Sequence, residues 1–219
     1  MNQLNEFIKS FDLIIFDLDG TLIDSHNQIE KAMNQARIEL GYGKSPSGQI
    51  FHKLGQPVYD LFIDLQISPT LQEQLVSLFR MYLTREIEVT NECFPNVIEL
   101  ISLIRSHGIN TAIATSKQTL MAQKVVSCSL LNGNIDHVQG TDGFTPKPNP
   151  KVINLCLDRF PECQAIMIGD RTEDIIAAKN AGIPSIGIAQ SAHSISDLQL
   201  AGATFSFENI SDFYNWAKT

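Results

Sequence analysis

The apolar residues of this chain follow two patterns, one typical of buried strands and one typical of helices. Residues 13–16 and 165–168 are short continuous apolar runs, which predict strands buried on both faces. Further strands are expected at 110–115, 137–140, 185–188 and 204–207, and helices at 96–104, 118–128, 150–160, 174–181 and 196–201. This alternation predicts an α/β fold, with a parallel sheet, right-handed crossovers and helices on both faces of the sheet.

A helical pattern interrupts this alternation directly after the first strand. Four apolar residues recur at helical spacing and predict an amphipathic helix that ends near Gly41: Ile29, Met33, Ala36 and Leu40. A loop is expected over 41–56, a short helix over 58–65 and a longer helix over 71–82.

The position of this helical stretch predicts how the chain is divided. Residues 1–22 and 93–219 are expected to form the α/β core, and residues 23–92 a helical cap. Because ligands of open α/β sheets bind outside the carboxyl ends of the strands, a cap that leaves from the first strand would lie over the site as a lid.

Composition narrows the classes of partner. The chain has 219 residues, 43% of them hydrophobic and 18% charged, which is ordinary for a globular protein. A net charge of -8 argues against binding to nucleic acid or to an anionic membrane surface, but not against a small anionic substrate, because a metal ion can reverse the local sign. The sequence predicts a monomer or a small homo-oligomer.

The cellular compartment is predicted from three features of the sequence. The four cysteines contain no Cys-x-x-Cys pair, which favours free buried thiols in a reducing compartment. Residues 1–12 lack the continuous apolar stretch of a signal peptide, and no run is long enough to span a bilayer. The expectation is a cytoplasmic protein that does not bind membranes.

Polar side chains with potential chemistry follow the predicted strands. Asp17 and Asp19 come directly after the first strand, and residues two apart on an extended chain point the same way. Gly20 then permits a sharp turn or a close approach to a ligand. Taken alone, this stretch is more typical of a strand that ends in an Asp-Gly turn. Other strands lead to further polar residues, namely Thr115, Ser116, Lys147, Asp170 and Asp174.

Each of these residues also has a structural interpretation. Lys147 can be a solvated loop lysine, Thr115 and Ser116 can cap the next helix, and Asp174 can be a favourable charge at a helix N-terminus. The topology nevertheless places all of them at one edge of one sheet, and this convergence favours a site. The five histidines are scattered without metal-ligand spacing, which argues against zinc.

In this order, the motifs resemble those of the haloacid dehalogenase superfamily of hydrolases. Asp17-Leu18-Asp19-Gly20-Thr21 resembles its first motif, Thr115-Ser116 its second, Lys147 in Lys-Pro-x-Pro its third, and the run from Gly169 to Asp174 its fourth. The resemblance implies a Rossmann-like parallel sheet, and the insertion is similar to the helical C1 cap. Ala114-Thr115-Ser116-Lys117 and the Gly-Asp-Arg-x-x-Asp form look most like the phosphoglycolate phosphatase and 5′-nucleotidase-like branch.

The resemblance implies a role for each motif residue. Asp17, the main-chain carbonyl of Asp19, Asp170 and Asp174, the last directly or through water, would hold Mg²⁺, which prefers oxygen ligands. Asp17 would attack phosphorus and form an aspartyl-phosphate, while Asp19 would act as general acid and then as general base. Thr115, Ser116 and Lys147 would bind the phosphoryl oxygens.

The resemblance implies a Mg²⁺-dependent phosphatase that acts on a small phosphorylated metabolite. Asp19 favours phosphate esters over dehalogenation, because a departing halide needs no proton. A sugar phosphomutase of the same superfamily is one alternative. A non-catalytic regulatory protein that binds phosphate is another, although the presence of Asp19 and Lys147 counts against it. Phosphonatase chemistry needs a lysine in the cap, and Lys31, Lys44 and Lys53 leave it formally open.

Substrate choice is expected to lie in the cap, chiefly within residues 41–56. The candidates for contact with the leaving group are His52, Lys53, Gln56, Arg80 and Arg85. For any one of these five residues, an ordinary solvated position is the simpler interpretation.

Overall fold

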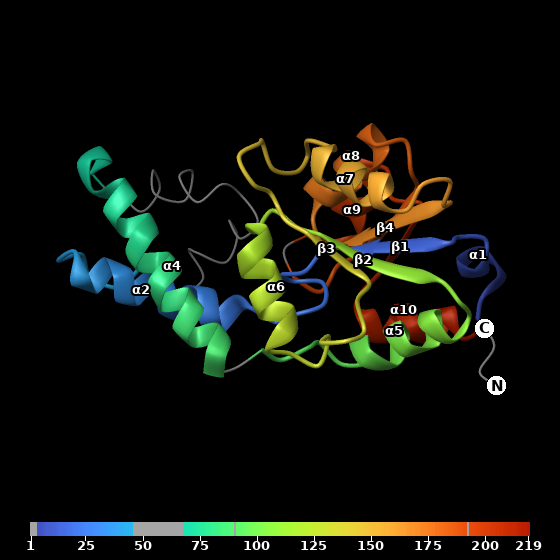
Figure 1. Ribbon diagram of the computed structural model, residues 1–219, viewed down its shortest axis with the longest axis horizontal. Coiled ribbons are helices and arrows are strands. Elements are labelled where there is room, and N and C mark those ends of the chain that lie inside the picture. The colour runs from blue at the N-terminus through green and yellow to red at the C-terminus, as the bar shows by residue number, and fades with distance from the viewer. Residues whose placement is uncertain (1–3, 46–67, 90, 192) are drawn as a thin grey trace.

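The computed structural model describes residues 4–45, 68–89, 91–191 and 193–219. Within these ranges a six-stranded parallel sheet forms the centre of the molecule (Figure 1), with strand order β3-β2-β1-β4-β5-β6. The strands are β1 Leu13–Phe16, β2 Asn110–Ala114, β3 His137–Gln139, β4 Ala165–Gly169, β5 Ser185–Ile188 and β6 Phe205–Phe207. The predicted α/β class and parallel sheet are confirmed, and β1 lies between β2 and β4.

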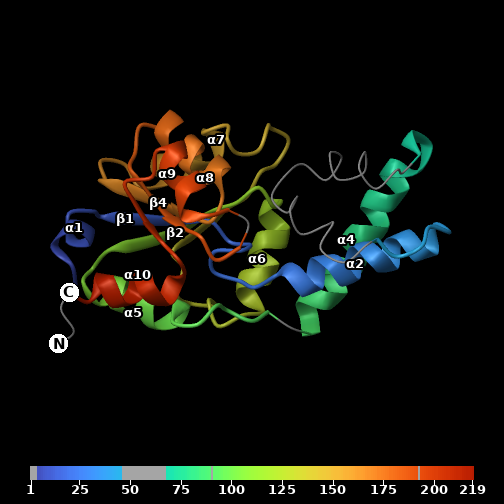
Figure 2. The same cartoon turned by 180° about the vertical axis from the view of Figure 1, so that it is seen from behind.

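Helices cover both faces of the sheet, as the alternation predicted. The helices of the α/β part are α1 Glu6–Lys9, α5 Val97–Ser106, α6 Thr119–Ser127, α7 Lys151–Arg159, α8 Thr172–Asn180, α9 Ile195–Ala201 and α10 Ile210–Ala217. Figures 1 and 2 show α7 to α9 over one face and α5 with α10 under the other. None of the helices in the described ranges combines the length and the apolar character that a membrane span requires.

The alternation of side chains along β1 divides the core into two layers. Ile14 and Phe16 pack with α5, α6 and α10, whereas Leu13 and Ile15 pack with α7 and α8. All four side chains are fully buried, which is why this strand appears in the sequence as a continuous apolar run rather than an alternating one.

Two longer helices extend beyond the carboxyl ends of the strands. Helix α2 covers His26–Glu39 and packs against α4, Gln72–Val89, which follows a 3-10 turn at Pro69–Leu71. Figure 1 shows this pair to one side of the sheet, with α6 between it and β2. The predicted short helix at 58–65 and most of the predicted loop at 41–56 lie outside the described residues.

Two details differ from the sequence-based expectations. Helices α1 and α10 were not predicted, although Asn209 caps α10 and its buried residues Ile210, Phe213 and Ala217 have helical spacing. The four cysteines are free, as expected, but only Cys156 is buried. Cys128 is exposed because it lies at the end of α6, after the last turn that faces the core.

Candidate functional site

The first part of the site is the turn that follows β1. The backbone N–H of Asp17 donates to the carbonyl of Ile168 (2.8 Å), so the pairing with β4 continues to this residue and buries its side chain. Gly20 has φ +87°, and a Cβ added there would lie 2.6 Å from Asp170 Oδ2 and 2.7 Å from Ser191 Oγ. Any larger residue would be strained and would clash with these two side chains. Glycine therefore allows the turn to pass directly beside Asp170.

Three buried carboxylates meet at the ends of β1 and β4. Asp17, Asp170 and Asp174 each bring an oxygen within 4.8 Å of the others. Thr21 Oγ1 donates to Asp170 Oδ1 (2.8 Å), and the backbone N–H of Arg171 donates to Asp174 Oδ2 (3.0 Å). Asp174 therefore fits both interpretations given from the sequence, because it lies at the N-terminus of α8 and also meets the other two carboxylates. We refer to these three residues as the acidic cluster.

Lys147 is the buried cation that contacts this cluster. Its Nζ lies 2.6 Å from Asp17 Oδ1 and 2.5 Å from Asp174 Oδ1, and it donates to the carbonyl of Ala114 (2.9 Å). The peptide bond to Pro148 is cis. Only 4% of the lysine side chain is exposed, so the solvated loop lysine considered from sequence is excluded.

Burial and mutual repulsion shift the pKa values in the cluster. Burial raises the pKa of Asp17 to about 6 against the attraction of Lys147, with Asp174 and Asp19 adding repulsion. Burial, followed by the charges of Asp17 and Asp174, raises the pKa of Asp170 to about 8. Burial opposes the charge of Lys147, but the attraction of Asp17 and Asp174 outweighs it and raises the pKa of the lysine. The cluster therefore carries more negative charge than one lysine balances.

The acidic cluster fits a divalent cation. Asp170 Oδ2 is buried and has no hydrogen-bond partner among the described residues, and it belongs to the residue whose pKa is raised most strongly within the cluster. Buried carboxylate oxygens close to one another are the donor set that Mg²⁺ prefers. A cation at this position would offset the repulsion that raises these pKa values.

The end of β2 brings Thr115 and Ser116 to the same edge. Thr115 is buried, and its Oγ1 accepts a hydrogen bond from the backbone N–H of Lys117 (3.2 Å). Ser116 is half-buried. The N-cap of α6 is Gln118, so neither Thr115 nor Ser116 is the capping residue of that helix. Because Thr115 Oγ1 is the acceptor in this bond, its own hydroxyl hydrogen can be donated elsewhere.

Asp19 lies beside the cluster rather than in it. Its Oδ2 forms an ion pair with Lys117 Nζ at 2.9 Å, and no donor among the described residues reaches its buried Oδ1. Lys117 was given no role from sequence, because nothing in the local pattern indicates that it reaches the end of β1.

A second set of contacts was also missed from sequence. His26, the first residue of α2, lies with Nε2 3.0 Å from Ser191 Oγ and Nδ1 2.8 Å from Asp24 Oδ1. Ser191 follows β5, and its hydroxyl lies close enough to the Asp170 carboxyl to lower the pKa of that group against the larger effect of burial. The half-buried ring of His26 therefore lies between Asp24 and the loop after β5.

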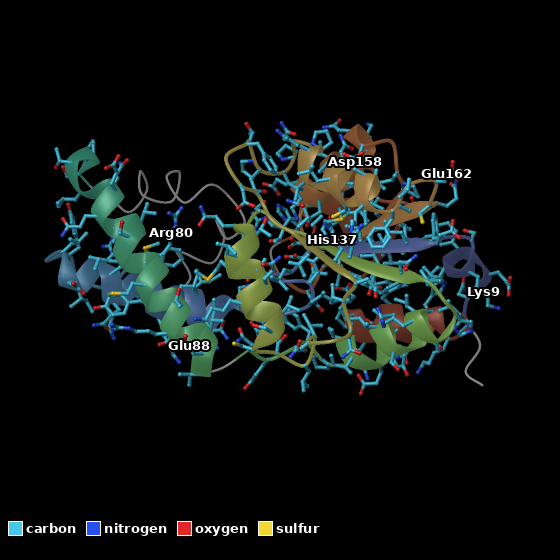
Figure 3. The ribbon with its side chains drawn as sticks, viewed as in Figure 1. Lys9, Arg80, Glu88, His137, Asp158 and Glu162 are labelled. Carbon is cyan, nitrogen blue, oxygen red and sulfur yellow. The ribbon has the colours of Figure 1, made fainter. Side chains whose placement is uncertain are left out.

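Two of the five cap residues predicted to choose the substrate belong to the part of the chain that the structure describes. His52, Lys53 and Gln56 lie outside the described residues. Arg80 and Arg85 are exposed on α4 (Arg80 is labelled in Figure 3), and the Arg85 guanidinium lies 5.5 Å from the centre of the Tyr82 ring. The structure therefore gives the two arginines no contact with the acidic cluster.

Two of the three lysines considered for phosphonatase chemistry are described. Lys31 is exposed and lies 3.8 Å from Glu86, and Lys44 is exposed as well. A lysine that forms a Schiff base needs a desolvated site, and the side chains of both of these lysines are exposed. The third, Lys53, lies outside the described residues.

Comparisons with known proteins found a matching family model and similar sequences and structures. Residues 14–188 match the family model described as haloacid dehalogenase-like hydrolase. The chain is 32% identical over 197 residues to a protein named probable phosphatase IndB from Dickeya dadantii, with 86% of each chain covered. It is 31% identical over 193 residues to a phosphoglycolate phosphatase from Vibrio cholerae, with 83% of this chain and 85% of the relative covered.

A solved structure of similar shape is the haloacid dehalogenase-like family protein SP0104 from Streptococcus pneumoniae. It has a TM-score of 0.85 and 27% sequence identity, and the match covers 94% of this chain and 98% of that one. The likeness extends over the α/β part and the two longer helices together, because the match covers almost the whole of both chains.

Proposed function

The chain belongs to the haloacid dehalogenase-like hydrolases, and from that premise we propose that it is a Mg²⁺-dependent phosphatase of a small phosphorylated metabolite. The observation that carries the proposal is the meeting of three buried carboxylates with one buried lysine at the ends of adjacent strands. Residues 23–92 would form the helical cap over this site, and residues 1–22 and 93–219 the core.

Asp17, Asp170 and Asp174, together with the main-chain carbonyl of Asp19, would hold the metal ion. When bound, Mg²⁺ supplies positive charge that offsets the repulsion between the carboxylates and the phosphoryl oxygens. The buried, unpartnered Oδ2 of Asp170 supports this assignment. Lys147 would remain charged, because Asp17 and Asp174 raise its pKa.

The first chemical step would be attack by Asp17 on phosphorus. A bond forms between a carboxylate oxygen of Asp17 and phosphorus while the bond from phosphorus to the leaving oxygen breaks, and Asp19 gives its proton to that oxygen. The free Oδ1 of Asp19 is the atom available for this transfer. The product of the step is an aspartyl-phosphate and a free alcohol.

The second step would return Asp17 to its starting state. Asp19, now a carboxylate, takes a proton from water while the water oxygen attacks phosphorus. The bond between Asp17 and phosphorus breaks and inorganic phosphate is released. Thr115 would donate its hydroxyl hydrogen to a phosphoryl oxygen, and Lys147 with Ser116 would bind the others.

The variant Asp17→Asn tests the proposal. The amide cannot act as the carboxylate nucleophile, so we expect release of phosphate from p-nitrophenyl phosphate to fall below detection while the far-ultraviolet circular dichroism is unchanged. Asp158→Asn, at an exposed position of α7 (Figure 3), is the matched control and should retain full activity. Activity of Asp17→Asn near that of the wild type would remove Asp17 from the mechanism.

A second assay, with a sugar phosphate as the substrate, separates the alternative functions. Supplied with a sugar phosphate, a phosphomutase would yield an isomeric sugar phosphate, whereas a phosphatase yields inorganic phosphate. A non-catalytic phosphate-binding protein would yield neither.

A further inference from the structure

The loop after β5 contacts the surroundings of Asp170 from two sides. Gln190 Nε2 donates to the backbone carbonyls of Gly20 (3.0 Å) and Thr21 (2.9 Å). Thr21 Oγ1 in turn donates to Asp170 Oδ1. Ser191 Oγ lies beside the other carboxyl oxygen, because a Cβ added to Gly20 would be 2.7 Å from Ser191 Oγ and 2.6 Å from Asp170 Oδ2. The position of this loop therefore affects how the Asp170 carboxyl is oriented.

His26 connects this loop to the segment through which the chain enters α2. Its Nε2 lies 3.0 Å from Ser191 Oγ, and its Nδ1 lies 2.8 Å from Asp24 Oδ1. An ionised carboxylate only accepts hydrogen bonds, so Nδ1 carries the hydrogen in the contact with Asp24. Asp24 thereby fixes the orientation of the ring and presents Nε2 to Ser191.

Asp24 lies where two segments connect the sheet with the α2–α4 pair. Its backbone N–H donates to the carbonyl of Glu92 (3.0 Å), and the preceding residue, Ile23, forms an antiparallel bridge with Cys93. The segment that enters α2 and the segment that follows α4 in the sequence therefore run side by side here. A displacement of α2 relative to the sheet would act directly on Asp24 and His26.

We propose that His26 is a positioning residue for the metal ligand Asp170 and acts on it through Ser191. This inference rests on the proposed function, because it takes the acidic cluster as the site of the divalent cation. Asp24, His26 and Ser191 form one line of contacts from the connecting segments to Asp170. The orientation of a metal ligand, and with it the affinity for the cation, then depends on the position of α2 relative to the sheet.

The same three side chains also have the order of a serine nucleophile, its general base and the carboxylate that orients the base. Attack by Ser191 on a carbonyl group would place a developing oxyanion next to the Asp170 carboxyl, and like charges at short distance repel. An oxyanion needs hydrogen-bond donors at this position rather than an acidic cluster. The geometry therefore favours a role in orienting Asp170 over a separate nucleophilic activity.

The experiment measures binding of Mg²⁺ to the metal-free protein without substrate. Isothermal titration calorimetry gives the Kd for the wild type, His26→Ala, His26→Gln, Ser191→Ala and the double variant that combines His26→Ala with Ser191→Ala. Asn27→Ala, at the next position of α2 and exposed, is the matched control. Far-ultraviolet circular dichroism in EDTA establishes that each variant is folded before it is titrated.

We expect His26→Ala to raise the Kd for Mg²⁺ roughly tenfold, the lower end of the range for residues that orient a metal ligand. His26→Gln should restore most of the affinity, because the glutamine amide can place an N–H near the position of Nε2. In the Ser191→Ala background, His26→Ala should cause no further loss, since the hydroxyl through which it acts is absent. Asn27→Ala should bind Mg²⁺ as the wild type does.

Three results would overturn the inference. One is a Kd in His26→Ala within about twofold of the wild type. Another is a loss in His26→Ala that is equally large in the Ser191→Ala background, because His26 would then act by a different route. The third is an equal loss in His26→Ala and His26→Gln, which would mean that the ring only packs. Absence of Mg²⁺ binding in the wild type is a different result, because it refutes the metal site of the proposed function and this inference with it.

Discussion

Replacement of Asp170 by asparagine is expected to stabilise the metal-free protein at pH 8. Asp170 faces Asp17 and Asp174 with carboxylate oxygens within 4.8 Å, and Lys147 contacts the other two members of the cluster instead. At an effective dielectric constant of about 20, two unit charges at this distance repel by about 3 kcal/mol. The side chain of asparagine keeps the acceptor for Thr21 and can donate from its NH₂ group to a neighbouring carboxylate.

The raised pKa of Asp170 determines how the stability of the metal-free protein changes with pH. The pKa of Asp170 is raised from 3.8 to about 8, so the folded protein holds a proton that the unfolded chain releases above pH 4. The contribution of this group to stability is fully present below about pH 4 and is lost as the pH rises through about 8. The slope over this window is roughly 1.4 kcal/mol per pH unit for one proton. Wild-type protein without metal is therefore expected to lose stability between pH 5 and pH 8.

The asparagine variant lacks this titration. After relaxation of the site and entry of water are allowed for, we expect the free energy of unfolding of the variant to be about 3 kcal/mol higher than that of the wild type at pH 8. This difference corresponds to a rise in Tm of roughly 10 °C for a chain of this size. At pH 5 the difference should shrink to a small fraction of that value. Added Mg²⁺ should stabilise the wild type, by about 3 kcal/mol at a hundredfold excess over its Kd, and should stabilise the variant much less.

The assay is thermal unfolding followed by circular dichroism in EDTA, at pH 5 and pH 8, repeated with MgCl₂. The exposed Asp158→Asn serves as the control for loss of a carboxylate without a cluster. A Tm of Asp170→Asn below that of the wild type at pH 8, or an equal advantage at both pH values, would refute the assignment of a repulsive metal-binding cluster.

Three further outcomes are expected. Lys147→Met should lower turnover of p-nitrophenyl phosphate by ~10²-fold or more and lower the Tm in EDTA, because the cluster loses the buried lysine that contacts Asp17 and Asp174. Dialysis against EDTA should abolish phosphate release and MgCl₂ restore it, whereas activity that survives chelation would remove the metal from the mechanism. Ser191→Ala should weaken Mg²⁺ binding about tenfold by isothermal titration calorimetry, because Ser191 and His26 orient Asp170; unchanged affinity would limit both residues to packing.

The sheet could be predicted from the sequence because its strands are buried on both faces. Leu13 to Phe16 has no solvent-facing position, and so its pattern is a continuous apolar run that ends where the carboxylates begin. The meeting of Asp17, Thr115 and Asp170 at one edge then follows from the topology, because parallel strands present their carboxyl ends to the same edge. The short helix α10 was missed, although Ile210, Phe213 and Ala217 have helical spacing, because its eight residues directly follow a three-residue strand.

The contacts made by long side chains and by loops could not be predicted in this way. Lys117 reaches Asp19 through a flexible side chain, and no periodicity records where its ammonium group lies. Ser191 and His26 meet because the loop after β5 returns to the start of α2, and each residue taken alone is an ordinary polar position. Such contacts depend on the tertiary arrangement, and the local sequence of neither segment indicates which distant segment it will contact.

The buried charges at the site explain how a chain with a net charge of -8 can be suited to an anionic substrate. At physiological ionic strength the Debye length is about 8 Å, so exposed acidic residues elsewhere on the surface contribute little at the site. The buried charges are screened much less, and their sign is what an incoming phosphate meets. Lys147, Lys117 and a cation bound by the acidic cluster would together set that sign, which is why loss of any one of them is expected to matter more than the overall charge.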